Sequence, residues 1–140
     1  MGNSINKINF MKYFGVDVYD ATFISPFVLD ENQSLESQDF LLDSEIGGLD
    51  FLFRQYEFFL TIAWYGDKDD LFNENNVFVI RIYEPVNFEG RKTFFKKIAR
   101  TDFGELKKLL HEAVEFMEKM KTMSDKDIQE FPDLNYWSIR

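Results

Sequence analysis

The alternation of apolar and polar residues is strongest in the middle of the chain, where it predicts β-strands. Every second residue is large and apolar over Leu49–Phe53 and again, after a change of phase, over Tyr56–Trp64. A period of two is the signature of a strand with one buried face. Val77–Glu84 and Thr93–Ala99 read as further strands, and the short connections predict an antiparallel meander. The change of phase predicts a bulge or bend near Arg54–Gln55.

The last third of the chain has the period of an α-helix instead. Asp102 and Glu105 have the spacing of a capping box, which marks a helix start. Apolar residues then recur at intervals of three and four: Leu106, Leu109, Leu110, Ala113, Val114, Met117 and Met120. This stripe predicts a helix from about Phe103 to Lys121, packed on one face of the sheet. The predicted fold class is therefore α+β, an antiparallel sheet meander with one long helix in the C-terminal half.

The remaining segments give weaker patterns. Val16–Ser25 is rich in β-branched and aromatic residues and predicts one strand, whereas the polar segment Asp30–Asp39 predicts a loop. Phe40–Leu42 reads as the start of a short strand, and Gly47–Gly48 as a turn. Ser124 and Asp127 predict a short second helix that ends before Pro132. The aromatic residues of the C-terminal tail, Tyr136 and Trp137, predict a segment that docks on the sheet.

Composition narrows the class of protein. The 140 residues contain no repeat or linker, which predicts a single domain over residues 1–140. The absence of cysteine excludes disulfides and thiolate metal sites and favours a reducing, cytoplasmic location. The longest nearly apolar run, Phe58–Tyr65, is far shorter than the roughly twenty residues of a membrane helix. Residues 1–14 contain no continuous apolar stretch, so no secretory signal is expected.

Charge is distributed unevenly along the chain. The net charge is −9, and the segment Tyr13–Phe53 contains nine acidic residues but no Lys or Arg. Basic residues cluster in Arg91–Lys108 instead. A strongly acidic protein repels nucleic acid and anionic membranes, so the expected partner is a basic protein.

Three interpretations of the acidic segment remain open. It is a solvated face that maintains solubility, a docking surface for a basic protein, or an imitation of a nucleic-acid backbone. The docking hypothesis assigns partner binding to the acids of the polar loop and its flanks, with Asp17 and Asp20 as secondary members and with aromatic residues as apolar anchors. The residues are Asp30, Glu31, Glu36, Asp39, Asp43, Glu45, Asp17 and Asp20, with Phe40, Tyr19 and Phe27 as anchors.

Candidate catalytic and metal-binding groups are sparse. His111 is the only histidine, it has charged neighbours, and no nucleophile motif accompanies it. The acids of the loop Gly66–Asn76 lack the ligand spacing of a calcium-binding loop. We therefore expect a protein that is not an enzyme and that needs neither a metal nor another cofactor. The oligomeric state is left open.

The small acidic chain without cysteine, with its meander and late helix, resembles immunity proteins of bacterial polymorphic toxins, including those of contact-dependent growth inhibition systems. The base-free segment Tyr13–Phe53 and the run Phe58–Tyr65 carry this resemblance. It implies stoichiometric binding of a toxin domain, of which many are nucleases with basic clefts. The alternatives are a phage or plasmid decoy that mimics nucleic acid, an enzyme whose carboxylates assemble only in the fold, and a non-catalytic subunit or adaptor of a larger complex.

Overall fold

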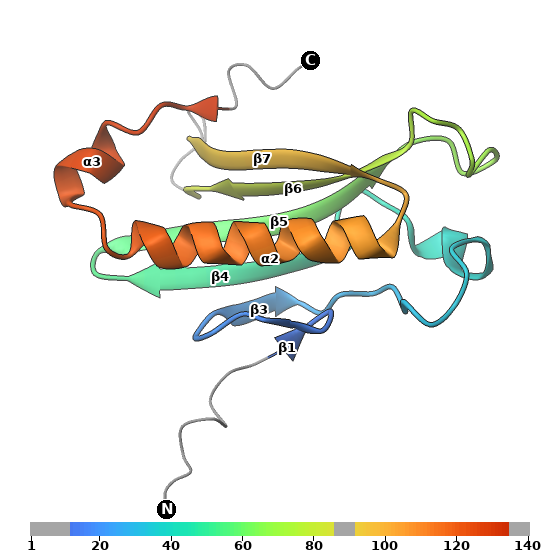
Figure 1. Ribbon diagram of the computed structural model, residues 1–140, viewed down its shortest axis with the longest axis horizontal. Coiled ribbons are helices and arrows are strands. Elements are labelled where there is room, and N and C mark those ends of the chain that lie inside the picture. Colours follow the sequence, from blue (N-terminus) through green and yellow to red (C-terminus); the bar gives the residue numbers. More distant parts are fainter. Residues whose placement is uncertain (1–11, 86–91, 135–140) are drawn as a thin grey trace, which may run out of the picture.

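The fold is an α+β arrangement in which one long helix lies across one face of a five-stranded antiparallel sheet (Figure 1). The computed structural model describes residues 12–85 and 92–134. The sheet contains β3 (Thr22–Ser25), β4 (Gly47–Phe53), β5 (Tyr56–Tyr65), β6 (Val77–Tyr83) and β7 (Thr93–Arg100), in that spatial order. Since neighbours in the sequence are also neighbours in the sheet, the predicted meander is confirmed.

Cross-strand register divides the sheet into two unlike faces, because antiparallel partners point to the same side. Leu49 of β4 pairs with Leu60 of β5, which pairs with Ile82 of β6. These three side chains are fully buried and face the helix. In the next row, Thr61 of β5 pairs with Arg81 of β6, so a polar row lies on the opposite face.

Helix α2 (Phe103–Met120) supplies the other half of the core. The predicted stripe is confirmed, since Leu106, Leu110, Val114 and Met117 are fully buried. The N-cap is also confirmed, because the carboxylate of Asp102 accepts a hydrogen bond from the backbone N–H of Gly104 at 2.8 Å. The capping box does not close as predicted. The carboxylate of Glu105 accepts the backbone N–H of Arg100 at the end of β7 instead, which ties the helix to the sheet.

The segment Val16–Ser25 is not one strand, and the prediction was wrong at its centre. Residues 18–21 form a turn between β2 (Val16–Asp17) and β3, and Tyr19 there has a left-handed φ of 54°. β2 pairs instead with β1 (Lys12–Tyr13) in a separate two-stranded hairpin. Val18 and Ala21 are buried within the turn, so its apolar character reflects packing and not a continuous strand.

Gly47–Gly48 was predicted as a turn but begins strand β4. The hydroxyl of Tyr13 accepts a hydrogen bond from the N–H of Gly48 at 2.7 Å and donates one to the carbonyl of Ser25 at 2.8 Å. A Cβ at position 47 would collide with this hydroxyl. Glycine is therefore required in the strand because a distant side chain approaches its backbone. Burial raises the pKa of Tyr13 to about 12, so the phenol stays protonated as a donor.

Two local predictions near the edges of these strands can also be resolved. Of the bulge or bend predicted near Arg54–Gln55, the structure has the bend: the two residues form a hairpin turn, since Phe53 pairs directly with Tyr56 and Arg54 has a φ of 54°. Phe40–Leu42 does not begin a strand. Residues Glu36–Leu41 form the 3-10 helix η2, with a kink at Gln38.

The C-terminal end follows the prediction as far as the structure describes it. Helix α3 (Asp125–Gln129) begins at Ser124, whose hydroxyl accepts the N–H of Asp127. Phe131 then stacks on Phe94 with ring centroids 5.1 Å apart. The predicted docking of Tyr136 and Trp137 lies outside the described residues.

Leu110→Ala should test the contact between α2 and the sheet. Leu110 is fully buried, so its truncation leaves a cavity and should reduce the free energy of unfolding by about 3 kcal/mol. The exposed neighbour His111 provides the control, and His111→Ala should change the stability by less than about 0.5 kcal/mol. Chemical denaturation of both variants measures the difference. Equal stability of the two variants would contradict the packing described here.

Candidate functional site

A groove lies at the end of the sheet where η2, the β5–β6 loop and the start of α2 meet (Figure 1). It consists of two adjoining hollows of about 190 and 170 Å³ that share Ser34, Leu35 and Thr101. We call this surface the acidic groove. Its lining residues are Gln33, Ser34, Leu35, Glu36, Leu71, Phe72, Phe78, Thr101, Asp102 and Phe103.

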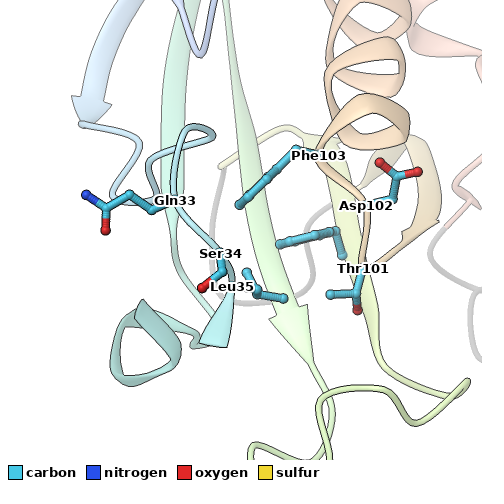
Figure 2. Close-up of a pocket in the computed structure, with 7 residues that line it drawn as sticks. Gln33, Ser34, Leu35, Thr101, Asp102 and Phe103 are labelled. Atoms are coloured by element: carbon cyan, nitrogen blue, oxygen red, sulfur yellow. The ribbon is translucent and has the colours of Figure 1, made fainter. Parts of the chain in front are cut away.

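The interior of the groove is apolar and its rim is polar. Figure 2 shows Leu35, Thr101 and Phe103 around the first hollow, with the amide of Gln33 turned away from it. Phe78 and Phe103 meet behind this hollow with ring centroids 6.3 Å apart. Glu36 and Phe72 line the second hollow. An apolar floor with a charged rim is the usual anatomy of a protein-binding surface.

Two buried amide side chains hold the loops that form the groove. Gln38 is 5% exposed; its side-chain oxygen accepts the N–H of Asp30, and its amide nitrogen donates to the carbonyl of Asp30, both at 2.8 Å. Asn76 is 2% exposed and makes the corresponding pair of bonds to Asp67 and Asp70, both at 2.9 Å. The loops are therefore fixed by internal hydrogen bonds, which limits the entropy lost when a partner binds.

Of the predicted binding residues, Glu36, Asp39 and Phe40 lie on η2 beside the groove. Phe40 is 73% exposed. Within residues 12–85 and 92–134, no Lys or Arg side chain forms an ion pair with the following acids: Asp30, Glu36, Asp39, Asp43 and Glu45. The carboxylates of Asp30 and Asp43 instead accept backbone N–H groups, from Asn32 and Ser44 respectively.

The other predicted acids lie away from the groove and have basic neighbours. Asp17 pairs with Lys12 at 2.7 Å and Asp20 pairs with Lys121 at 2.8 Å. Glu31 pairs with Lys107 of α2 at 2.7 Å. Such exposed pairs are each worth less than about 1 kcal/mol, but they lower the local negative charge. The charge separation along the sequence is thus partly cancelled in space.

The predicted aromatic anchors differ in whether they pack within the fold or are exposed to solvent. Phe27 is half-buried and its ring lies 4.3 Å from that of Phe14, while the Tyr19 hydroxyl donates to Glu115 on α2 at 2.8 Å. Both side chains are used within the fold, whereas Phe40 projects into solvent.

Sequence reasoning missed the contribution of the β5–β6 loop. Phe72 is 84% exposed and lines the same hollow as Glu36. The available signal was the pair Leu71–Phe72, two large apolar residues inside an otherwise polar loop. Asp67, Asp69 and Asp70 of this loop are exposed acidic residues.

The described part of the chain offers little that is typical of other kinds of site. It contains no group of three or more His, Asp or Glu side chains arranged to hold a metal ion. His111 is exposed and borders a shallow hollow between α2 and the β1–β2 hairpin. None of the helices in residues 12–85 and 92–134 combines the length and the apolar character needed to span a bilayer.

A second unusual surface is the sheet face opposite α2, which we call the open face. No helix of the described residues lies across it (Figure 1). Asp50 of β4 and Glu57 of β5 form a hydrogen-bonded carboxyl pair there. Burial, followed by the hydrogen bond and charge of Glu57, raises the pKa of Asp50 to about 6. On the same face Arg81 of β6 and Lys96 of β7 are cross-strand partners, and burial followed by the charge of Arg81 lowers the pKa of Lys96.

Gln38→Ala should loosen the groove. It removes the partner of the Asp30 N–H and carbonyl, which should lower the free energy of unfolding by about 1–3 kcal/mol. Hydrogen exchange at the Asp30 amide should accelerate. The exposed residue Gln33 provides the control, since Gln33→Ala should leave both quantities nearly unchanged. Unchanged exchange in Gln38→Ala would contradict the role given to this amide.

Asp50→Asn should stabilise the protein at neutral pH. Its pKa of about 6 in the folded state exceeds the unfolded value of about 3.9, so ionisation destabilises the fold as pH rises through 6. The variant should gain on the order of 1 kcal/mol at about pH 8, a value reduced by partial solvent screening. The gain should vanish as pH falls to about 4, where the wild-type carboxyl is protonated in the fold. Thermal unfolding at both pH values measures this, and an equal gain at both would refute the assignment.

Comparisons of the chain with protein-family models, with curated proteins and with solved structures found no match. The functional argument therefore rests on the groove, the charges and the exposed side chains described above.

Proposed function

We propose that this chain is an immunity protein that binds a cognate toxin domain and occludes its basic site, with a nuclease as the toxin. The observation that carries the proposal is the presence of Glu36 and Phe72 at one hollow. Glu36, which forms no ion pair in the described part of the chain, thus lies at one hollow with the exposed ring of Phe72, and the exposed ring of Phe40 lies on the same 3-10 helix as Glu36. Aromatic anchors supply affinity, and surrounding carboxylates supply charge complementarity.

Occlusion requires no chemical step in this protein. A nuclease cleft binds phosphates through Lys and Arg side chains, and carboxylates presented on η2 offer those side chains alternative acceptors. The net charge of −9 would also accelerate encounter with a basic domain, since long-range attraction raises association rates. The protein would act in the cytoplasm, where disulfides are not needed for stability and where an incoming nuclease would find nucleic acid.

The partner should be identified by affinity capture from the native host followed by mass spectrometry, and the product of the adjacent gene should be tested directly. Expression of a toxin domain found in this way should kill a test strain, and co-expression of this chain should restore growth. Capture of no basic protein, together with failure to protect against the adjacent gene product, would refute the proposal.

The double variant Glu36→Lys and Asp39→Lys should then slow association with the captured toxin domain by about tenfold or more and weaken its salt dependence. Phe72→Ala should weaken binding by about 2 kcal/mol through faster dissociation. The matched control reverses two exposed acids at α3, Asp127→Lys and Glu130→Lys, and changes the net charge equally. Surface plasmon resonance measures both rates. If the two double variants behave alike, only net charge matters and the groove is not the interface.

A further inference from the structure

The open face contains a hollow of about 330 Å³ that shares no lining residue with the acidic groove. It lies over β5 and β6, beside the segment that precedes β4, and we call it the open-face hollow. Thr61 pairs with Arg81 and Ala63 pairs with Val79, so two adjoining cross-strand rows of the open face meet there. Ala63 and Val79 are each 7% exposed and form an apolar floor. Sites for small molecules typically have volumes of about 300–1,000 Å³, and this hollow lies at the lower end of that range.

Two side chains of opposite charge line the open-face hollow without pairing. Arg81 comes from the middle of β6, and Glu45 comes from the segment just before β4. Neither forms an ion pair within residues 12–85 and 92–134. Opposite charges that stay apart on one small surface can each bind a group of the other sign on a ligand.

The guanidinium of Arg81 is held in place but only partly satisfied. Its carbon lies 5.0 Å from the centre of the Tyr83 ring, and its Nη2 donates to the hydroxyl of Thr93 at 3.1 Å. Its buried Nε has no hydrogen-bond partner among the described residues. A guanidinium fixed in this way is preorganised for a carboxylate, whose two oxygens match its planar fork of donors.

The charges and the floor together select a class of ligand. A simple anion would be attracted by Arg81 but repelled by Glu45, and a simple cation would meet the reverse pattern. A zwitterion matches both charges. The apolar floor, together with the ring of Tyr65, which lines the hollow and is 53% exposed, offers a surface to an apolar side chain.

We propose that the open-face hollow binds a free α-amino acid with an apolar side chain. The carboxylate of the ligand binds the guanidinium of Arg81, its ammonium group binds the carboxylate of Glu45, and its side chain lies on Ala63 and Val79. This proposal does not depend on the acidic groove or on the identity of the toxin, so either can fail without the other.

An NMR titration of the isotope-labelled chain with L-phenylalanine should show one saturable site with a dissociation constant of about 1 mM or below. The backbone amide signals of Thr61 and Val79 should shift. Two analogues test the two charges separately, since L-phenylalaninamide lacks the carboxylate and N-acetyl-L-phenylalanine lacks the ammonium group. Each should bind at least about tenfold more weakly, because a charge-assisted hydrogen bond is lost. Absence of saturable binding, or equal affinity for L-phenylalanine and both analogues, would overturn the proposal.

Two variants assign each charge to its partner on the ligand. Arg81→Gln and Glu45→Gln should each weaken the binding of L-phenylalanine at least about tenfold. In Arg81→Gln, L-phenylalaninamide should bind as well as L-phenylalanine, because the carboxylate has lost its partner. In Glu45→Gln, N-acetyl-L-phenylalanine should bind as well as L-phenylalanine, because the ammonium group has lost its partner. The reverse pairing of variants and analogues would contradict the assignment.

Matched controls remove the same charges outside the hollow. Arg54→Gln and Glu130→Gln alter exposed residues that do not line it, and neither should change the affinity for L-phenylalanine. Glu45 is exposed, so Glu45→Gln tests the site even if circular dichroism shows that Arg81→Gln disturbs the fold. Equal losses of affinity in control and hollow variants, or amide shifts confined to another surface, would refute the site.

Discussion

The structure depends on one packing contact, that between the apolar stripe of α2 and the inward face of the meander. Leu106, Leu110, Val114 and Met117 bury completely against a sheet whose own inward residues, such as Leu60 and Ile82, are equally buried. Helix α2 covers one face of the sheet, and no other helix of residues 12–85 and 92–134 lies across the opposite face. The loops at the groove end of the sheet are fixed by two buried amides, Gln38 and Asn76. Core, groove and open face are thus consequences of covering a five-stranded sheet from one side.

The same topology redistributes charge. Along the sequence, Tyr13–Phe53 contains nine acids and no base, whereas bases cluster in Arg91–Lys108. In space, α2 returns beside the N-terminal third, and Lys107 and Lys121 meet Glu31 and Asp20. The acids that keep an uncompensated charge are therefore those beyond the reach of α2, on η2 and just before β4. Their position gives a physical criterion for the carboxylates available to a partner, which the simple count of nine acids did not provide.

Periodicity predicted the elements whose structure is set by burial of a regular face. The strands from Leu49 to Ala99 and the helix from Phe103 follow their patterns closely because each buries one side along its whole length. The errors occur where a distant side chain decides the local conformation. Gly47–Gly48 has the composition of a turn, but the hydroxyl of Tyr13 holds it in a strand. Similarly, nothing local shows that Phe72 lines the same hollow as Glu36, because the two segments come together only in the folded chain.

The two exposed surfaces have different electrostatic character. Two carboxylates, those of Glu36 and Asp102, line the groove beside apolar side chains, so a basic partner would find groups of opposite charge there. The open face instead carries both signs, with acids on β4 and β5 and bases on β6 and β7. A uniformly basic partner would therefore gain less from the open face than from the groove.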